Sequence, residues 1–158
     1  MPRLRPVDDR DVADVLALNE RNVVKLAPMD EARLHQLRGL ADRFDVLEVD
    51  GAFGGFVVTF AAGTPYDSEN YRWFSSRRDD FYYLDRIVLH EDVRRRGLGG
   101  FVYDDVERTA APHGLLALEV NLVPRNEPSL AFHERRGYVE VGRLGDAEHL
   151  VSMMEKRL

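Results

Sequence analysis

The chain has 158 residues and a mass of 18.1 kDa, the size of one typical domain. It contains no cysteine, which excludes disulfides, a cysteine nucleophile and thiolate zinc sites. The formal net charge is −6, from 22 basic and 28 acidic side chains, so we expect no nucleic-acid partner. One local exception to this acidic balance is the arginine triplet Arg94-Arg95-Arg96.

No apolar run approaches the about 20 residues that span a bilayer, so we expect no membrane partner. The segment from Met1 to Pro6 lacks the apolar stretch of a secretory signal, which predicts a cytoplasmic protein. No repeat or linker divides the chain, and a single domain is expected over residues 1–158.

Hydrophobic periodicity and turn residues predict alternating elements in the first half of the chain. A helix is expected to begin after Asp8 or Asp9, and Asp50-Gly51 predicts a hairpin turn. Residues 64–79 are expected to form a long loop. The remaining elements expected here are strands over Leu4–Val7, Phe44–Val49 and Gly54–Phe60 and a helix over Asp30–Ala41.

The second half continues with alternating strands and helices and predicts an α/β fold with a mixed sheet. The complete expected order is β-α-α-β-β-β-α-β-α-β-β. Its later elements are strands over Phe81–Leu89, Leu115–Val120, Tyr138–Arg143 and His149–Glu155, and helices over Gly97–Ala111 and Pro128–Arg136.

A strand, a glycine-rich turn and a helix start follow one another near the middle of the chain. The first turn of a helix exposes unpaired N–H groups and carries positive partial charge. Glycines allow close backbone approach, and arginines attract anions, so the segment predicts a pyrophosphate cradle. The segment comprises Ile87, Val88 and Leu89, then Arg94, Arg95, Arg96, Gly97, Leu98, Gly99 and Gly100.

The cradle differs from the dinucleotide-binding Gly-x-Gly-x-x-Gly pattern and from a P-loop, which requires Gly-Lys-Ser/Thr. It fits Arg/Gln-x-x-Gly-x-Gly/Ala, matched by Arg94, Gly97 and Gly99. A second segment, residues 126–138 (NEPSLAFHERRGY), fits Asn-x-x-small-x-x-Phe-Tyr-x-x-x-Gly-Phe/Tyr except at His133. Together the two segments resemble the GNAT superfamily of N-acetyltransferases, over nearly the whole chain.

The resemblance implies a mixed, mostly antiparallel sheet, helices on both faces, and parallel fourth and fifth strands that splay apart. It also implies that acetyl-CoA (coenzyme A) lies in the splay, with its pyrophosphate on the glycine-rich turn. The strand backbone at Ile87, Val88 and Leu89 would then pair with the pantothenate arm. The second segment would contribute Asn126, Ser129, Phe132 and His133 to the same binding site.

The implied reaction is direct acetyl transfer to a primary amine, which needs a base because an ammonium has no lone pair. Asp85 is the first candidate base, because period-two alternation places it on one face with Ile87 and Leu89 unless the strand contains a bulge. Glu119 is second and Tyr83 third. The alternative for Asp85 is a structural partner of an arginine.

A tyrosine that can protonate the leaving thiolate is common in the family, and here His133 takes its place. Imidazole can donate a proton near neutral pH. The alternative is that His133 is structural and the thiolate leaves unassisted.

The acceptor site is expected between the first helices and the aromatic loop. Tyr71, Trp73 and Phe74 are candidate pocket walls, and Arg72 is a candidate clamp for a carboxylate. The alternative is a loop that buries its own aromatic residues, or a dimer contact. Residues 22–26 and Met29 are expected on the opposite wall.

The leading hypothesis is an acetyl-CoA-dependent N-acetyltransferase acting on a small molecule or an amino acid. The alternatives are a protein or peptide N-acetyltransferase and an inactive acetyl-CoA-binding module. The scattered histidines show no metal-ligand spacing, so no metal is expected. A homodimer remains a possible assembly.

Overall fold

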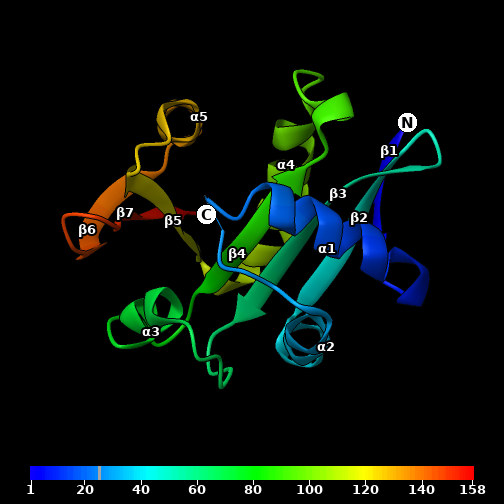
Figure 1. Ribbon diagram of the computed structural model, residues 1–158. Helices are drawn as coiled ribbons and strands as arrows, with labels where there is room; N and C mark the ends of the chain where they lie inside the picture. Colours follow the sequence, from blue (N-terminus) through cyan, green and yellow to red (C-terminus); the bar gives the residue numbers. More distant parts are fainter. Residues whose placement is uncertain (25) are drawn as a thin grey trace.

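The computed structural model describes residues 1–24 and 26–158 (Figure 1). The strands are β1 (Pro2–Pro6), β2 (Arg43–Val49), β3 (Ala52–Ala61), β4 (Tyr82–Leu89), β5 (Leu115–Val123), β6 (Val139–Gly145) and β7 (Leu150–Arg157). The helices are α1 (Val12–Arg21), α2 (Glu31–Leu40), α3 (Glu69–Ser75), α4 (Leu98–Ala110) and α5 (Glu127–Arg135). Short 3₁₀ turns are η1 (Asp9–Asp11), η2 (Glu91–Val93) and η3 (Ala111–His113).

Within the described residues the strands form one sheet in the order β1-β2-β3-β4-β5-β7-β6. Neighbouring strands are antiparallel except β4 and β5, which are parallel. The β4–β5 register joins Tyr82 to Leu116 and Tyr83 to Ala117, near the start of both strands. From there β5, β7 and β6 turn away from β4 (Figure 1). The expected mixed sheet with splayed fourth and fifth strands is confirmed.

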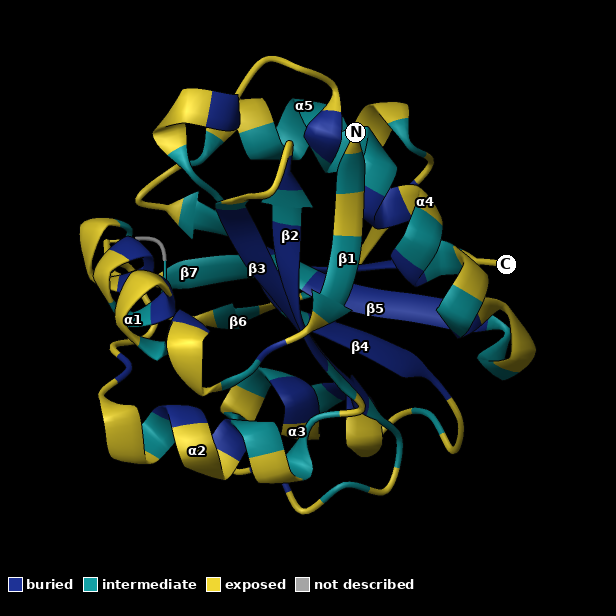
Figure 2. Cartoon of the chain, turned by 90° about the vertical axis from the view of Figure 1, so that its right-hand side faces the viewer, coloured by how far each residue is buried: buried dark blue, intermediate teal, exposed yellow. Residues whose placement is uncertain are grey.

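Helices cover both faces of the sheet, as expected. One hydrophobic cluster joins α1, α2 and α3 to the sheet, and the other joins α4 to its opposite face. Figure 2 shows the central strands buried and the outward helix surfaces exposed. Near-continuous apolar strands such as β3 and β5 suit this arrangement, because both of their faces are covered.

One prediction is wrong: residues 64–79 contain the helix α3 and are not a continuous loop. The Ser68 hydroxyl caps its start by accepting the N–H of Tyr71 at 3.2 Å. Tyr71 and Phe74, three residues apart, are 2% and 0% exposed and bind the helix to the core. Two turns are too short for a clear helical period in the sequence.

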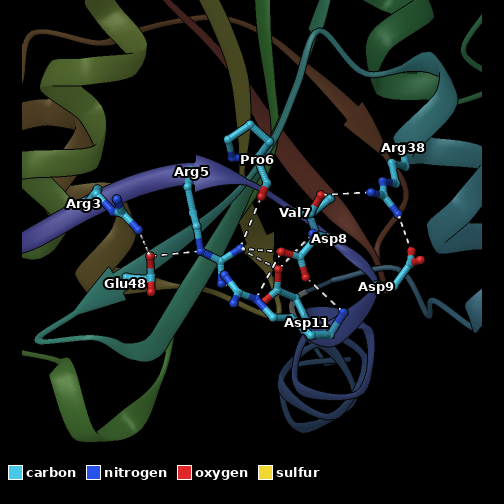
Figure 3. A network of polar contacts seen from close by, with 10 residues as sticks. Arg3, Arg5, Pro6, Val7, Asp8, Asp9, Asp11, Arg38 and Glu48 are labelled. Atoms are coloured by element: carbon cyan, nitrogen blue, oxygen red, sulfur yellow. Dashed lines mark hydrogen bonds and ion pairs between the residues drawn. The ribbon is translucent and has the colours of Figure 1, made fainter.

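A polar network holds the edge strand β1 and the turn that follows it (Figure 3). Arg5 donates to both carboxylate oxygens of Asp11, at 2.7 and 2.8 Å, and forms an ion pair with Glu48 at 2.9 Å. Asp8 caps the turn η1 by accepting the N–H of Arg10. Asp8 is one of the two residues, Asp8 and Asp9, that the sequence predicts to precede the first helix. The network fixes the direction from which α1 enters.

Gly142 on β6 lies directly under the Trp73 indole, where an added Cβ would come within 2.8 Å of Cη2. Gly142→Ala is therefore expected to lower the free energy of unfolding by about 1–3 kcal/mol in urea titration, because the core must shift. Gly39→Ala is the control: it meets nothing within 4 Å on α2 and should stabilise slightly. Equal stability of the two variants would contradict the packing of Trp73 on β6.

Candidate active site

A cavity of about 660 Å³ opens where β4 and β5 separate. On the side of α1 to α3 its walls include Tyr66, Asp85 and Glu119. On the side of α4 and α5 they include Tyr103 and His133. The cavity therefore connects the two faces of the sheet, which an extended ligand can use.

The segment predicted to form an anion cradle lies at the start of α4. Gly97 is the N-cap residue, has φ +74° and provides no capping side chain. An added Cβ at Gly97 would meet nothing within 4 Å, so the space in front of the helix is open. The first N–H groups of α4, from Leu98 onward, lack intrahelical acceptors and favour an anion. These features fit a pyrophosphate.

The remaining cradle residues have distinct surroundings. An added Cβ at Gly99 would lie 3.6 Å from Phe132 Cζ, an ordinary van der Waals contact, so this glycine of α4 faces α5. Arg94 Nε donates to the Leu89 carbonyl at 3.2 Å. Arg95 and Arg96 are exposed, as is Gly97, and Gly100 is partly buried.

The backbone of Ile87, Val88 and Leu89 pairs with β3 on one side. The edge of β4 that faces β5 is past the last residue pair of these two strands, Tyr83–Ala117, when it reaches Ile87. Ile87 and Val88 line the cavity there. This is the geometry that strand-like pairing with a pantothenate arm requires.

Asp85 does not share a face with Ile87 and Leu89, and that expectation is wrong. The β3–β4 register passes from Val58–Arg86 to Thr59–Leu84, which leaves Asp85 as the extra residue of a bulge. A bulge breaks period-two alternation. Ile87 and Leu89 pack toward α4, whereas Asp85 contacts Tyr66 of the opposite cluster.

Asp85 has close partners, as its structural alternative predicts. Tyr66 donates its hydroxyl to Asp85 Oδ2 at 2.9 Å, and Arg86 Nε lies 3.4 Å from the same oxygen. The side chains of Asp85 and Arg86 are 8% and 4% exposed. Burial raises the pKa of Asp85, and the Arg86 charge opposes this rise.

Glu119 lies across the cavity on β5. The Tyr83 hydroxyl donates to its Oε2 at 2.5 Å, and the Asn70 side chain also forms a hydrogen bond with it. Burial, aided by the nearby charge of Asp85, raises the pKa of Glu119 to about 8. A carboxyl group of this kind exchanges a proton near neutral pH. The same cavity therefore holds two carboxylates with different partners.

His133 is bound at both ring nitrogens. Its Nδ1 lies 2.7 Å from the Ser129 carbonyl, which only accepts, so Nδ1 carries the hydrogen. Burial lowers the pKa of His133 and favours the neutral ring. The unprotonated Nε2 then accepts the Tyr103 hydroxyl at 2.5 Å. His133 has no free proton facing the cavity, which disagrees with a role as direct acid and agrees with the structural alternative.

The second motif begins α5. Asn126 is the N-cap residue and accepts the Ser129 N–H at 3.4 Å, and both residues line the cavity. Phe132 packs with its ring centroid 5.0 Å from that of Tyr103. Asn126 and Ser129 therefore lie at the cavity, and Phe132 lies against Gly99 of the predicted cradle.

The residues predicted to form the acceptor wall are not among the described residues that line the cavity. Tyr71 and Phe74 are core residues, and Arg72 is exposed. The Arg77 guanidinium stacks on the Trp73 ring, with its Cζ 3.8 Å from the ring centroid. This agrees with the alternative of a segment that buries its own aromatic residues. In the described part of the chain the cavity is instead lined by Tyr66, Ser68, Glu69 and Asn70 of the same segment.

The opposite wall is partly as expected. Asn22, Val23, Val24 and Leu26 line the cavity, while Lys25 lies outside the described residues. Met29 is a core residue with 7% exposure. The hairpin of β6 and β7 adds residues 144–145 and 149–151, which the sequence did not indicate.

The fold combines a cavity between two splayed parallel strands with an open helix start, a feature that suits a pyrophosphate. The model of the acetyltransferase (GNAT) family matches residues 11–138. The chain belongs to this family, so it is an acyltransferase that uses acetyl-CoA.

Solved structures of similar fold span almost the whole chain. Ard1 from Thermoplasma volcanium superposes with a TM-score of 0.78 at 16% identity, covering 99% of this chain and 97% of that one. A protein described as a putative phosphinothricin N-acetyltransferase gives a TM-score of 0.73 at 19% identity, covering 100% of this chain and 99% of that one. Arabidopsis thaliana Naa50 in complex with the bisubstrate analogue CoA-Ac-MVNAL gives 0.71 at 13% identity over 98% and 97%.

A search of curated proteins finds no matching sequence. None of the helices in residues 1–24 and 26–158 has the length and apolar character needed to cross a membrane.

Proposed function

We propose that the protein transfers an acetyl group from acetyl-CoA directly to the primary amine of a small molecule or an amino acid. The main support is Glu119, a carboxyl group with a raised pKa in the cavity between β4 and β5. When bound, acetyl-CoA would supply the acetyl thioester. A protein or peptide acceptor is the alternative, because Naa50, which has a similar fold, was solved in complex with the bisubstrate analogue CoA-Ac-MVNAL.

Glu119 is the base in this proposal, in place of the first-ranked Asp85. Tyr66 and Arg86 both contact the carboxylate of Asp85. The positive charge of Arg86 favours the ionised form of Asp85. Glu119 is hydrogen-bonded to Tyr83 and Asn70, and its pKa of about 8 lets it exchange a proton near neutral pH. Tyr83 holds Glu119 by donating to it, so Tyr83 is a positioning residue. Backbone N–H groups of β4 near Leu89 are the proposed donors to the carbonyl oxygen.

The remaining assignments are also proposals. Residues 1–158 would form one acetyltransferase domain that acts in the cytoplasm. The cradle from Arg94 to Gly100 and the start of α5 would hold the coenzyme. The acceptor would enter between the α1–α2 connection and α3.

An acetyl-CoA-dependent thiol-release assay over a panel of amines and amino acids tests the function. We expect release with at least one small amine and confirmation of the N-acetyl product by mass spectrometry. Tight coenzyme binding without release for any small molecule or peptide would favour the inactive binding module. Release with peptides alone would favour the protein N-acetyltransferase.

Asp85→Asn separates the two candidate bases. The charge of Asp85 raises the pKa of Glu119, so its removal should lower that pKa below about 8. The rising limb of kcat/KM should then move to lower pH with the same acceptor, while substantial activity remains. If Asp85 were the base, the variant would instead lose about 100-fold or more in kcat/KM over the whole pH range.

A further inference from the structure

We propose that Tyr103 donates a hydrogen bond to the sulfur as it leaves, and that His133 is the residue that positions this hydroxyl. The proposal rests on the proposed acetyl transfer. It assigns the task that the family motif places at His133 to a residue on a different helix.

Hydrogen-bond direction is the first argument. The Ser129 carbonyl fixes the hydrogen of His133 on Nδ1, so Nε2 is an acceptor and the Tyr103 hydroxyl is the donor, at 2.5 Å. The hydroxyl hydrogen can turn about the C–O bond toward another acceptor. Without the coenzyme, His133 keeps this buried hydroxyl paired.

The second argument is location. Tyr103 is 3% exposed but lines the cavity, together with His133. Tyr103 and His133 lie on the face of the sheet that α4 and α5 cover, where the proposed cradle also lies. Glu119 bonds Tyr83 on the opposite face. A thioester between the strands would thus meet a base on one side and a hydroxyl donor on the other.

The third argument is chemical. The amine nitrogen forms a bond to the carbonyl carbon and its proton passes to Glu119. The C–S bond breaks and its electron pair stays on sulfur, which accepts the hydrogen bond from Tyr103. An unperturbed thiol has a pKa of about 8.5 and tyrosine about 10, and burial raises the pKa of Tyr103 further. The proton therefore stays on Tyr103, and the thiolate takes its proton from water after release.

Binding of coenzyme A and its desulfo analogue tests the proposal independently of turnover. Calorimetry at about pH 9, where a thiol is largely ionised, should show the parent preferring coenzyme A by about 10-fold, because the Tyr103 hydroxyl donates a hydrogen bond to the charged sulfur. Tyr103→Phe should lose this preference and keep its affinity for the desulfo analogue. Tyr138→Phe is the matched control, because that hydroxyl bonds Glu107 in the same aromatic cluster.

Kinetics test the positioning role of His133. Tyr103→Phe should lower kcat about 10- to 100-fold with little change in the KM for acetyl-CoA. His133→Gln, whose side-chain oxygen can accept the hydroxyl, should retain more activity than His133→Phe. The double variant Tyr103→Phe/His133→Phe should be no slower than Tyr103→Phe alone, whereas independent structural effects would add.

A retained preference for coenzyme A over the desulfo analogue in Tyr103→Phe would overturn the proposal. So would additive losses in the double variant, or equal activity of His133→Gln and His133→Phe. These outcomes concern the sulfur and leave the proposed amine acceptor untouched. Failure of the parent to acetylate any amine would contradict the proposed function instead.

Discussion

Gly97→Glu is expected to abolish measurable coenzyme A binding at micromolar concentrations. The N-cap position has open space in front of α4, and a glutamate there would occupy the cradle with a negative charge. Losing two charge-assisted hydrogen bonds of about 1.5–3 kcal/mol each weakens binding by about 100-fold or more. Calorimetric titration with coenzyme A measures the effect.

Gly63→Glu is the matched control for backbone strain and charge. Gly63 also has a positive φ, +82°, and an added Cβ there also meets nothing within 4 Å. It lies between β3 and α3 and is not among the cavity residues, so this variant should bind coenzyme A like the parent. If Gly97→Glu bound coenzyme A as well as Gly63→Glu does, the cradle assignment would be wrong.

The strand, glycine turn and helix start of the proposed cradle could be predicted from sequence because they are contiguous. A strand, a positive-φ glycine and a helix start follow within fourteen residues, from Ile87 to Gly100, and each has a local signature. The acidic net charge and the arginine triplet are therefore compatible, since the triplet immediately precedes this helix start.

The chemistry of the cavity depends on contacts that no local pattern encodes. The bulge at Asp85 is set by the register with β3, and it turns a candidate base toward Tyr66. Tyr103 and His133 are 30 residues apart and come together only when α4 and α5 pack. Only the structure reveals which nitrogen of His133 carries the hydrogen.

The two cavity carboxylates have different electrostatic environments. Asp85 has an adjacent guanidinium that favours its ionised form, and its charge in turn keeps a proton on Glu119 to higher pH. Neutralising one carboxylate therefore changes the other, so the effects of Asp85→Asn and Glu119→Gln should not add.

Glu119→Gln is expected to lower kcat/KM for the amine by about 100- to 10,000-fold, the usual contribution of a general base. Coenzyme A affinity should change little, because the cradle lies on the other side of the sheet. In the parent, kcat/KM should rise with pH through about 8, as Glu119 loses its proton. In Glu119→Gln the pH profile should lack this rise. Glu140→Gln on β6, outside the cavity, is the control and should match the parent.

Stability gives a second readout for the same substitution. An unfolded glutamate releases its proton at a pKa of about 4.3. The folded protein holds the Glu119 proton until about pH 8. Between these values the native state binds more protons, so the free energy of unfolding falls as pH rises. Glutamine has no such titration, so in urea Glu119→Gln should gain stability relative to the parent between about pH 5 and pH 9. A parallel pH dependence in both proteins would show that Glu119 ionises normally and would remove the main support for its role as the base.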